Sequence, residues 1–148
     1  MTKFLILSFL ILSSCGYQPL YTNKNSENLT FNKINLIGNK TINRKIVSVL
    51  NFTEKDSNYS YDELALSSKK NIRVTSRNDK GQATSYNQTV EALIIFKRDD
   101  KIIKQKSFIV DFSYNTKDNK FDLAEHEKQV ENNLVDEVIE KLIIYINL

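Results

Sequence analysis

The spacing of hydrophobic positions changes along the chain and predicts alternating kinds of secondary structure. Ile34 and Leu36 alternate with polar residues, which is the period of a strand, and this strand is expected to end at Gly38. Apolar residues then recur at every fourth position from Ile42 to Leu50, which is the period of a helix that buries one face. The pattern therefore predicts a strand followed by an amphipathic helix.

The predicted helix covers residues 42–52, and either Asn39 or Thr41 is expected to cap its start. A polar loop is predicted over residues 53–60. Residues 61–66 leave two alternatives open, because their alternation fits a short strand and their Asp-Glu-Leu-Ala composition fits a helical turn.

Three strands are predicted next, with a turn between the first and second and another between the second and third. Residues 72–75 alternate, residues 83–96 form the longest strand candidate, and residues 102–114 return beside it. The turn signals are Asn78–Gly81 and Asp99–Lys101, which contain the polar residues and glycine typical of tight turns. The residues of the last strand that are expected to face one way are Phe108, Val110, Phe112 and Tyr114.

The C-terminal segment has the period of a long helix with acidic residues near its start, where negative charge suits the helix dipole. Its predicted apolar face contains Val130, Leu134, Val135, Val138, Ile139, Leu142, Ile143 and Ile146. The order of elements is β-α-β-β-β-α, with the doubtful residues 61–66 set aside. The prediction is an α+β fold in which two helices pack on one mostly antiparallel four-stranded sheet.

The first residues have a pattern that is not part of a fold. Lys3 precedes the apolar stretch Phe4–Leu12, and Ser13, Ser14 and Cys15 follow it. This order of charge, apolar segment and small residues is typical of a secretory signal, and it is too short to span a membrane as a helix. Its last four residues resemble the lipobox of bacterial lipoproteins, in which the cysteine is acylated and becomes the first residue of the mature chain.

Cys15 is the only cysteine, so an internal disulfide is excluded and acylation explains the single thiol. The expected organisation is a signal peptide over residues 1–14, a lipidated N-terminus and tether over residues 15–28, and one α+β domain over residues 29–148. By resemblance to other lipoproteins, Gly16 permits transfer to the outer membrane.

Composition excludes several functional classes. The chain has 148 residues and a formal net charge of +3, which becomes +2 without residues 1–14 because they hold one Lys and no acid. A charge this small and evenly spread does not indicate a nucleic-acid partner. His126 is the single histidine, so neither a histidine-based catalytic site nor a zinc site is expected. Asp99 and Asp100 fit a turn better than a catalytic pair. We therefore expect no enzymatic activity and no cofactor.

Four stretches resemble, in order, motifs of the lipopolysaccharide-assembly lipoprotein family LptE. They are Cys15–Tyr21 (CGYQPLY), Gly81–Asn87 (GQATSYN), Ser113–Asn115 (SYN) and Phe121–Glu125 (FDLAE). The first, beside a lipobox, is the most specific. The predicted order of elements is also similar to that of the family.

The resemblance implies an interaction subunit. Family members plug the lumen of the outer-membrane barrel LptD, help it to assemble and are thought to contact lipopolysaccharide, while acyl chains such as palmitate anchor them on the periplasmic side. Two alternatives from other classes are a lipoprotein carrier, which needs a large apolar cavity for a lipid, and a periplasmic hydrolase, for which no site is found. For lipopolysaccharide phosphates, Arg77 and Lys80 beside the turn before the long strand are the candidate ligands.

Overall fold

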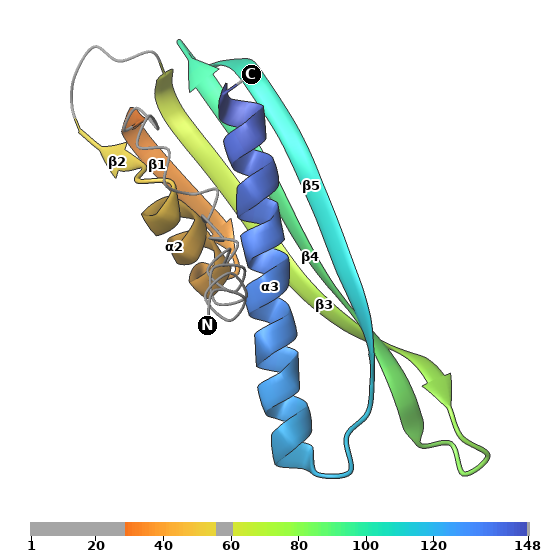
Figure 1. The fold of residues 1–148 in the computed structure, drawn as a ribbon. Coiled ribbons are helices and arrows are strands. Elements are labelled where there is room, and N and C mark those ends of the chain that lie inside the picture. Colours follow the sequence, from red (N-terminus) through yellow and green to blue (C-terminus); the bar gives the residue numbers. More distant parts are fainter. Residues whose placement is uncertain (1–28, 56–60, 148) are drawn as a thin grey trace, which may run out of the picture.

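The computed structural model describes residues 29–55 and 61–147, in which two helices cover one face of a five-stranded sheet (Figure 1). The predicted signal peptide, the acylated cysteine and the tether lie outside the described residues. The elements are β1 (Thr30–Gly38), α2 (Lys40–Val49), β2 (Thr53–Glu54), β3 (Tyr61–Arg77), β4 (Ala83–Arg98), β5 (Lys101–Asn115) and α3 (Lys120–Asn147). The predicted α+β class with two helices on one sheet is confirmed.

The sheet differs from the prediction in its number of strands and in their direction. Its order is β2-β1-β3-β4-β5. β1 runs parallel to both β2 and β3, whereas β3, β4 and β5 form an antiparallel meander. The predicted sheet of four mostly antiparallel strands is therefore corrected to a mixed sheet of five, in which the three long strands are antiparallel as expected. The physical reason is α2, which carries the chain back so that β3 starts at the same end of the sheet as β1.

β3 resolves the ambiguous residues 61–66 as strand and joins them to the predicted strand at 72–75. The sequence pattern assigns the polar residues 67–71 between them to no element, and two of their side chains form ion pairs with other elements. Lys69 lies 2.8 Å from Glu91 on β4, and Lys70 lies 2.6 Å from Glu131 on α3. The predicted loop 53–60 also contains the short β2 beside β1.

α2 begins two residues earlier and ends three residues earlier than the predicted helix. The side chain of Asn39 accepts hydrogen bonds from the backbone N–H groups of Thr41 and Ile42, at 3.0 and 3.1 Å. Asn39 is therefore the cap, which decides between the two candidates. The helix ends before Asn51, whose φ of 51° lies in the left-handed region.

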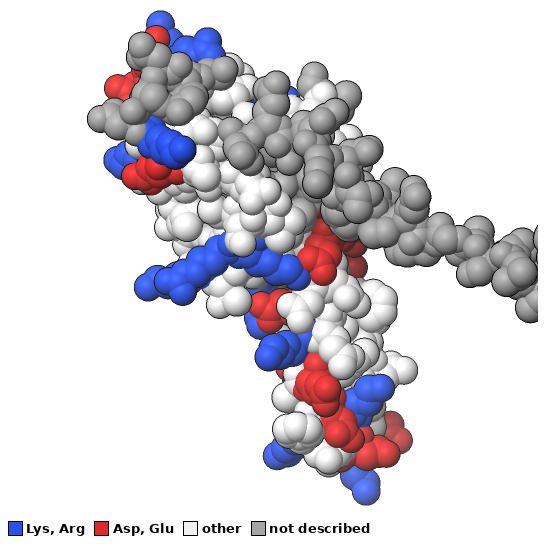
Figure 2. Space-filling model, turned by 60° about the vertical axis from the view of Figure 1, so that its left-hand side comes forward, with Lys and Arg blue, Asp and Glu red and all other residues white. Residues whose placement is uncertain are grey.

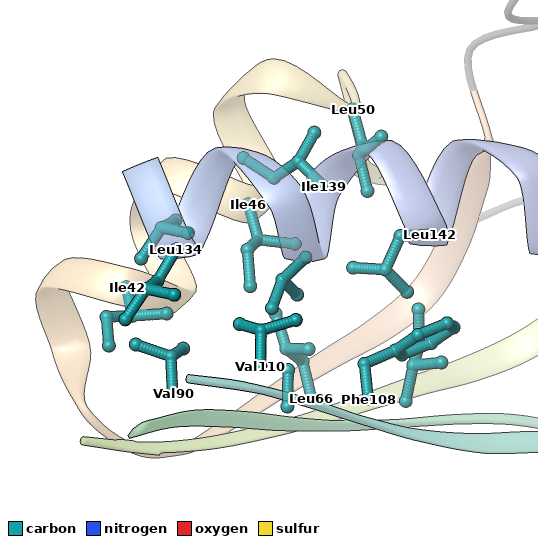
Figure 3. Packing of buried hydrophobic residues seen from close by; sticks show 14 of the residues in the cluster. Ile42, Ile46, Leu50, Leu66, Val90, Phe108, Val110, Leu134, Ile139 and Leu142 are labelled. Atoms are coloured by element: carbon teal, nitrogen blue, oxygen red, sulfur yellow. The ribbon is translucent and has the colours of Figure 1, made fainter. Parts of the chain in front are cut away.

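The core lies between the sheet and the two helices, where side chains of α2 and α3 point at the strands (Figure 3). The predicted apolar face of α3 is confirmed, since six of its residues are buried and the other two pack against the core. Figure 3 shows Ile46 of α2 and Leu142 of α3 above Leu66 and Val110 of the sheet. Phe112 lies on the predicted face but, unlike Phe108, Val110 and Tyr114, remains half exposed.

Candidate functional site

The turn between β3 and β4 carries both predicted ligand residues. Arg77 ends β3, and Lys80 lies within the turn that precedes β4. The side chain of Asn78 organises this turn by accepting hydrogen bonds from the backbone N–H groups of Lys80 and Gln82, at 3.0 and 2.9 Å. Gly81 completes it with a φ of 77°. The structure thus brings Arg77 and Lys80 to one turn, as the sequence predicts.

The side chains of Arg77 and Lys80 differ in how far they are available to bind a ligand. Arg77 donates a hydrogen bond of 2.8 Å from Nη1 to the carbonyl oxygen of Gly81, so part of its guanidinium holds the turn. Lys80 is exposed, and the carboxylate of the intervening Asp79 lowers the net charge of the turn. An anion that binds here would meet the remaining N–H donors of Arg77 and the ammonium of Lys80.

Arg73 is a third basic residue near this turn, and the sequence reasoning did not single it out. It lies on β3 four residues before Arg77 and is exposed. Its position becomes clear only because β3 is continuous through residues 67–71, which the sequence pattern left unassigned. By contrast, the two lysines earlier on β3 are already matched by glutamates.

Charge on the surface is mixed rather than gathered. Figure 2 shows, on the part of this face that is not grey, basic and acidic side chains interspersed with uncharged surface. Several of these charges are paired, as in Lys45 with Asp136 at 2.7 Å and Lys97 with Glu63 at 3.3 Å. The hydrogen bonds to Lys97 and Asn35 and the charge of Lys97 hold the pKa of Glu63 below its ordinary value, although burial, the largest single influence, raises it.

A polar cluster lies on the sheet face opposite the helices, on β4 and β5 and close to the β3–β4 turn. Asn87 on β4 is buried, and its side-chain NH₂ group donates to Asp111 at 2.7 Å and to Ser113 at 3.2 Å, both on β5. The hydroxyl of Thr89 donates to the amide oxygen of Asn87 at 3.3 Å. This cluster ties the beginning of β4 to the end of β5.

The other face of the same strand ends carries a pair of aromatic rings. The rings of Tyr86 and Tyr114 stack with their centroids 5.6 Å apart, and the rings of Tyr114 and His126 form a T-shaped pair with centroids 5.3 Å apart. The hydroxyl of Tyr114 donates to Glu127 at 3.2 Å. Burial, followed by the charge of Glu127 and this hydrogen bond, raises the pKa of Tyr114 to about 12. The structure thus turns the ring of His126, the single histidine, toward the sheet.

Other kinds of site find little support within the described residues. They contain no group of three or more His, Cys, Asp or Glu side chains placed to hold a metal ion. Asp99 and Asp100 form the β4–β5 turn, with φ values of 49° and 60°. No helix between residues 29 and 147 is long and apolar enough to cross a membrane. A hollow of about 440 Å³ lies between α2 and α3, lined by Val49, Asp136, Ile139 and Glu140.

Comparisons with known proteins identify the fold. No family model matches the chain, and no curated protein matches its sequence. Rare lipoprotein B from Shewanella oneidensis is 10% identical, with a TM-score of 0.60 over 78% of this chain and 94% of that one. An uncharacterized lipoprotein B from Nitrosomonas europaea is 11% identical, with a TM-score of 0.52 over 77% and 81%. The chain therefore has the fold of these solved bacterial lipoproteins.

Proposed function

We propose that this chain is a lipid-anchored lipoprotein of the LptE type, which sits in the outer membrane facing the periplasm. Its role is to plug an LptD-like barrel, to help that barrel assemble and to contact lipopolysaccharide during transport. Three observations support the proposal: the lipobox-like start, the order of the family-like motifs, and a fold shared with proteins that are themselves called lipoproteins.

One structural relationship carries the proposal furthest. Three family-like motifs meet at one end of the domain: the first is distant in sequence from the other two, which are only five residues apart. Gly81–Asn87 forms the turn and the start of β4, Ser113–Asn115 ends β5, and Phe121–Glu125 starts α3. Tyr86 is paired in register with Tyr114. This end, where the three motifs meet, is therefore the expected contact surface.

The uncovered face of the sheet suits a hydrated lumen. Its charges are largely paired within the face, as in Lys69 with Glu91 and Lys97 with Glu63. Such a face is compatible with the polar, water-filled interior of an outer-membrane barrel. β3 alone has 17 residues, which corresponds to roughly 55 Å at about 3.3 Å per residue. The meander is therefore long enough to reach through the outer-membrane thickness of a barrel.

Co-purification tests the proposal directly. Membranes that contain the tagged full chain are solubilised in mild detergent. The proteins that co-purify with the tag are identified, and the mass of the complex is measured. We expect a one-to-one complex with an outer-membrane β-barrel. Recovery of the chain alone, with a stoichiometric bound lipid, would instead support the carrier function.

Two exposed apolar residues of α3 provide a matched pair of variants. Phe121 lies in the family-like motif and is 73% exposed, whereas Ile144 lies near the other end of the helix and is 62% exposed. Both Phe121→Asp and Ile144→Asp should fold, since neither side chain belongs to the core. We expect only Phe121→Asp to reduce barrel recovery. Equal recovery with both variants would contradict the assignment of the contact surface.

The anchor has its own test. Intact-mass analysis of the membrane-extracted protein should show a chain that begins at Cys15 with added acyl mass. Two or more acyl chains hold a protein stably at a membrane, since each buried methylene contributes about 0.8 kcal/mol. A chain that starts elsewhere, or an unmodified Cys15, would contradict lipidation.

A further inference from the structure

α3 consists of two parts that are held in different ways. Its buried side chains begin at Val130 and continue to Leu142. The ten residues before Val130, residues 120–129, include no buried side chain. The C-terminal part is therefore fixed by the hydrophobic core, while the N-terminal part rests on the sheet without such support.

One strand residue, Tyr114, makes the hydrogen bond and the ring contact that join residues 120–129 to the sheet. Tyr114 donates its hydroxyl hydrogen to Glu127, and its ring meets the edge of the His126 ring. Leu123 adds a partly buried side chain against the core cluster. A single hydrogen bond and two partial packing contacts are a weak attachment for nearly three turns of helix.

A buried amide lies next to this weakly held part. Gln88 on β4 is fully buried, and neither its amide oxygen nor its amide nitrogen has a hydrogen-bond partner among the described residues. Gln88 is two residues from Tyr86, on the same side of the sheet, and it pairs in register with Ile72 and Phe112. This row lies between the Tyr114 contacts and the core row of Val90.

The closed arrangement is therefore locally unfavourable. A buried polar group without a partner loses the hydrogen bonds that water would give it, and nothing in the closed state returns them. The helix also covers this row only in part, because Ile72 remains 36% exposed and Phe112 remains 51% exposed. Residues 126 and 127 contact Tyr114 in the row next to Gln88, so lifting residues 120–129 would bring water to the row beside Gln88 and would break few contacts.

We infer that residues 120–129 of α3 form a flap that lifts from the sheet while Val130–Leu142 stays docked, and that lifting uncovers the row of Ile72, Gln88 and Phe112. The flap is a property of this fold and holds whether or not the chain assembles with a barrel. The contacts of Tyr114 hold the flap against the sheet, and the unpartnered amide of Gln88 favours the open state.

Hydrogen exchange on the full chain in detergent micelles tests the flap. The amides of residues 124–129 lie beyond the first turn, so ordinary fraying of a helix end does not reach them. We expect these amides to exchange at least tenfold faster than those of residues 134–142. Equal protection of the two groups, or fast exchange confined to residues 120–123, would overturn the inference.

Two variants test separately the effect of the unpartnered amide of Gln88 and the effect of the Tyr114 hydroxyl. Gln88→Leu replaces the amide with an apolar side chain of similar size and should slow exchange of residues 124–129 about tenfold. Tyr114→Phe removes the hydroxyl and should speed their exchange, with residues 134–142 unchanged. Gln105→Leu is the matched control on β5, where the glutamine is exposed, and it should leave the flap as it is. A Gln88→Leu variant with unchanged exchange would also overturn the inference.

Discussion

The hydroxyl of Ser68 on β3 donates a hydrogen bond of 2.6 Å to the side-chain oxygen of Asn43 on α2. The NH₂ group of Asn43 in turn donates to the carbonyl of Ile37 on β1, at 2.8 Å. Asn43 and Ser68 are both buried. This short chain of polar contacts joins two strands and a helix at the point where β1 passes into α2.

Gly38 makes that junction possible, and its replacement should be costly. It has a φ of 86°, and a Cβ atom would lie 2.1 Å from the carbonyl oxygen of Ser68. Gly38→Ala should therefore lower the free energy of unfolding by more than about 2 kcal/mol, since backbone strain and a backbone clash act together. Gly81→Ala is the control, because its φ is also positive but its Cβ would meet nothing within 4 Å. It should cost about 1 kcal/mol. Chemical denaturation measures both, and equal losses would contradict this account.

Leu134 tests which face of α3 belongs to the core. It is 4% exposed and, like Leu142, points toward the sheet (Figure 3). Leu134→Asp should unfold the domain, because an unpaired buried charge costs several kcal/mol, about 3–5. Circular dichroism and thermal unfolding give the readout. If the variant stays folded and loses only its binding partner, the face assignment is wrong.

Tyr114 predicts a loss of stability at high pH. Its folded pKa is about 12, compared with an ordinary value of 10. The folded chain therefore holds the phenol proton more tightly than the unfolded chain. The protonated Tyr114 contributes fully to the free energy of unfolding below pH 10, and this contribution is lost as the pH rises toward 12. At neutral pH, Tyr114→Phe should be less stable by about 1–2 kcal/mol, since it lacks the hydrogen bond to Glu127. The difference between the two proteins should shrink between pH 10 and 12. A constant difference across this range would contradict the prediction.

Arg77 and Lys80 remain the candidate phosphate ligands. The double variant Arg77→Ala with Lys80→Ala should weaken binding of purified lipopolysaccharide, since a charged hydrogen bond contributes roughly 1.5–3 kcal/mol. The turn should persist, because Asn78 holds it through its own side chain. Lys101→Ala in the β4–β5 turn is a control at the other end of β4, and it should bind as the unmodified chain does. Unchanged binding in a folded double variant would exclude this site.

Periodicity was sufficient for the elements that bury one regular face. The spacing of apolar residues predicted both helices and the long strands β4 and β5, because each buries alternate or every third and fourth side chain. It failed at residues 67–71, where polar side chains stand in a strand and are satisfied by partners distant in sequence. Ser68 bonds to Asn43, and Lys70 pairs with Glu131. No local pattern contains those partners.

The candidate site was predictable only in part for the same reason. A turn is a local feature, so the sequence could place Arg77 and Lys80 together. The convergence of the three motifs, the contacts of Tyr114 with α3 and the burial of Gln88 depend on strand register and on the path of α3. Strand register sets which residues face each other, and it is fixed by pairing across the sheet rather than by neighbouring residues.

The parallel pairing of β1 with β3 has a consequence for the order of folding. Each paired residue on β3 follows its partner on β1 by 30 positions, as in Phe31 with Tyr61. The meander from β3 to β5 needs only short connections, so its loop-closure entropy is small and it should form early. Synthesis of the chain delivers the strands in the opposite order, with β1 first. β1 must therefore wait for the later strands to build the edge of β3 with which it pairs.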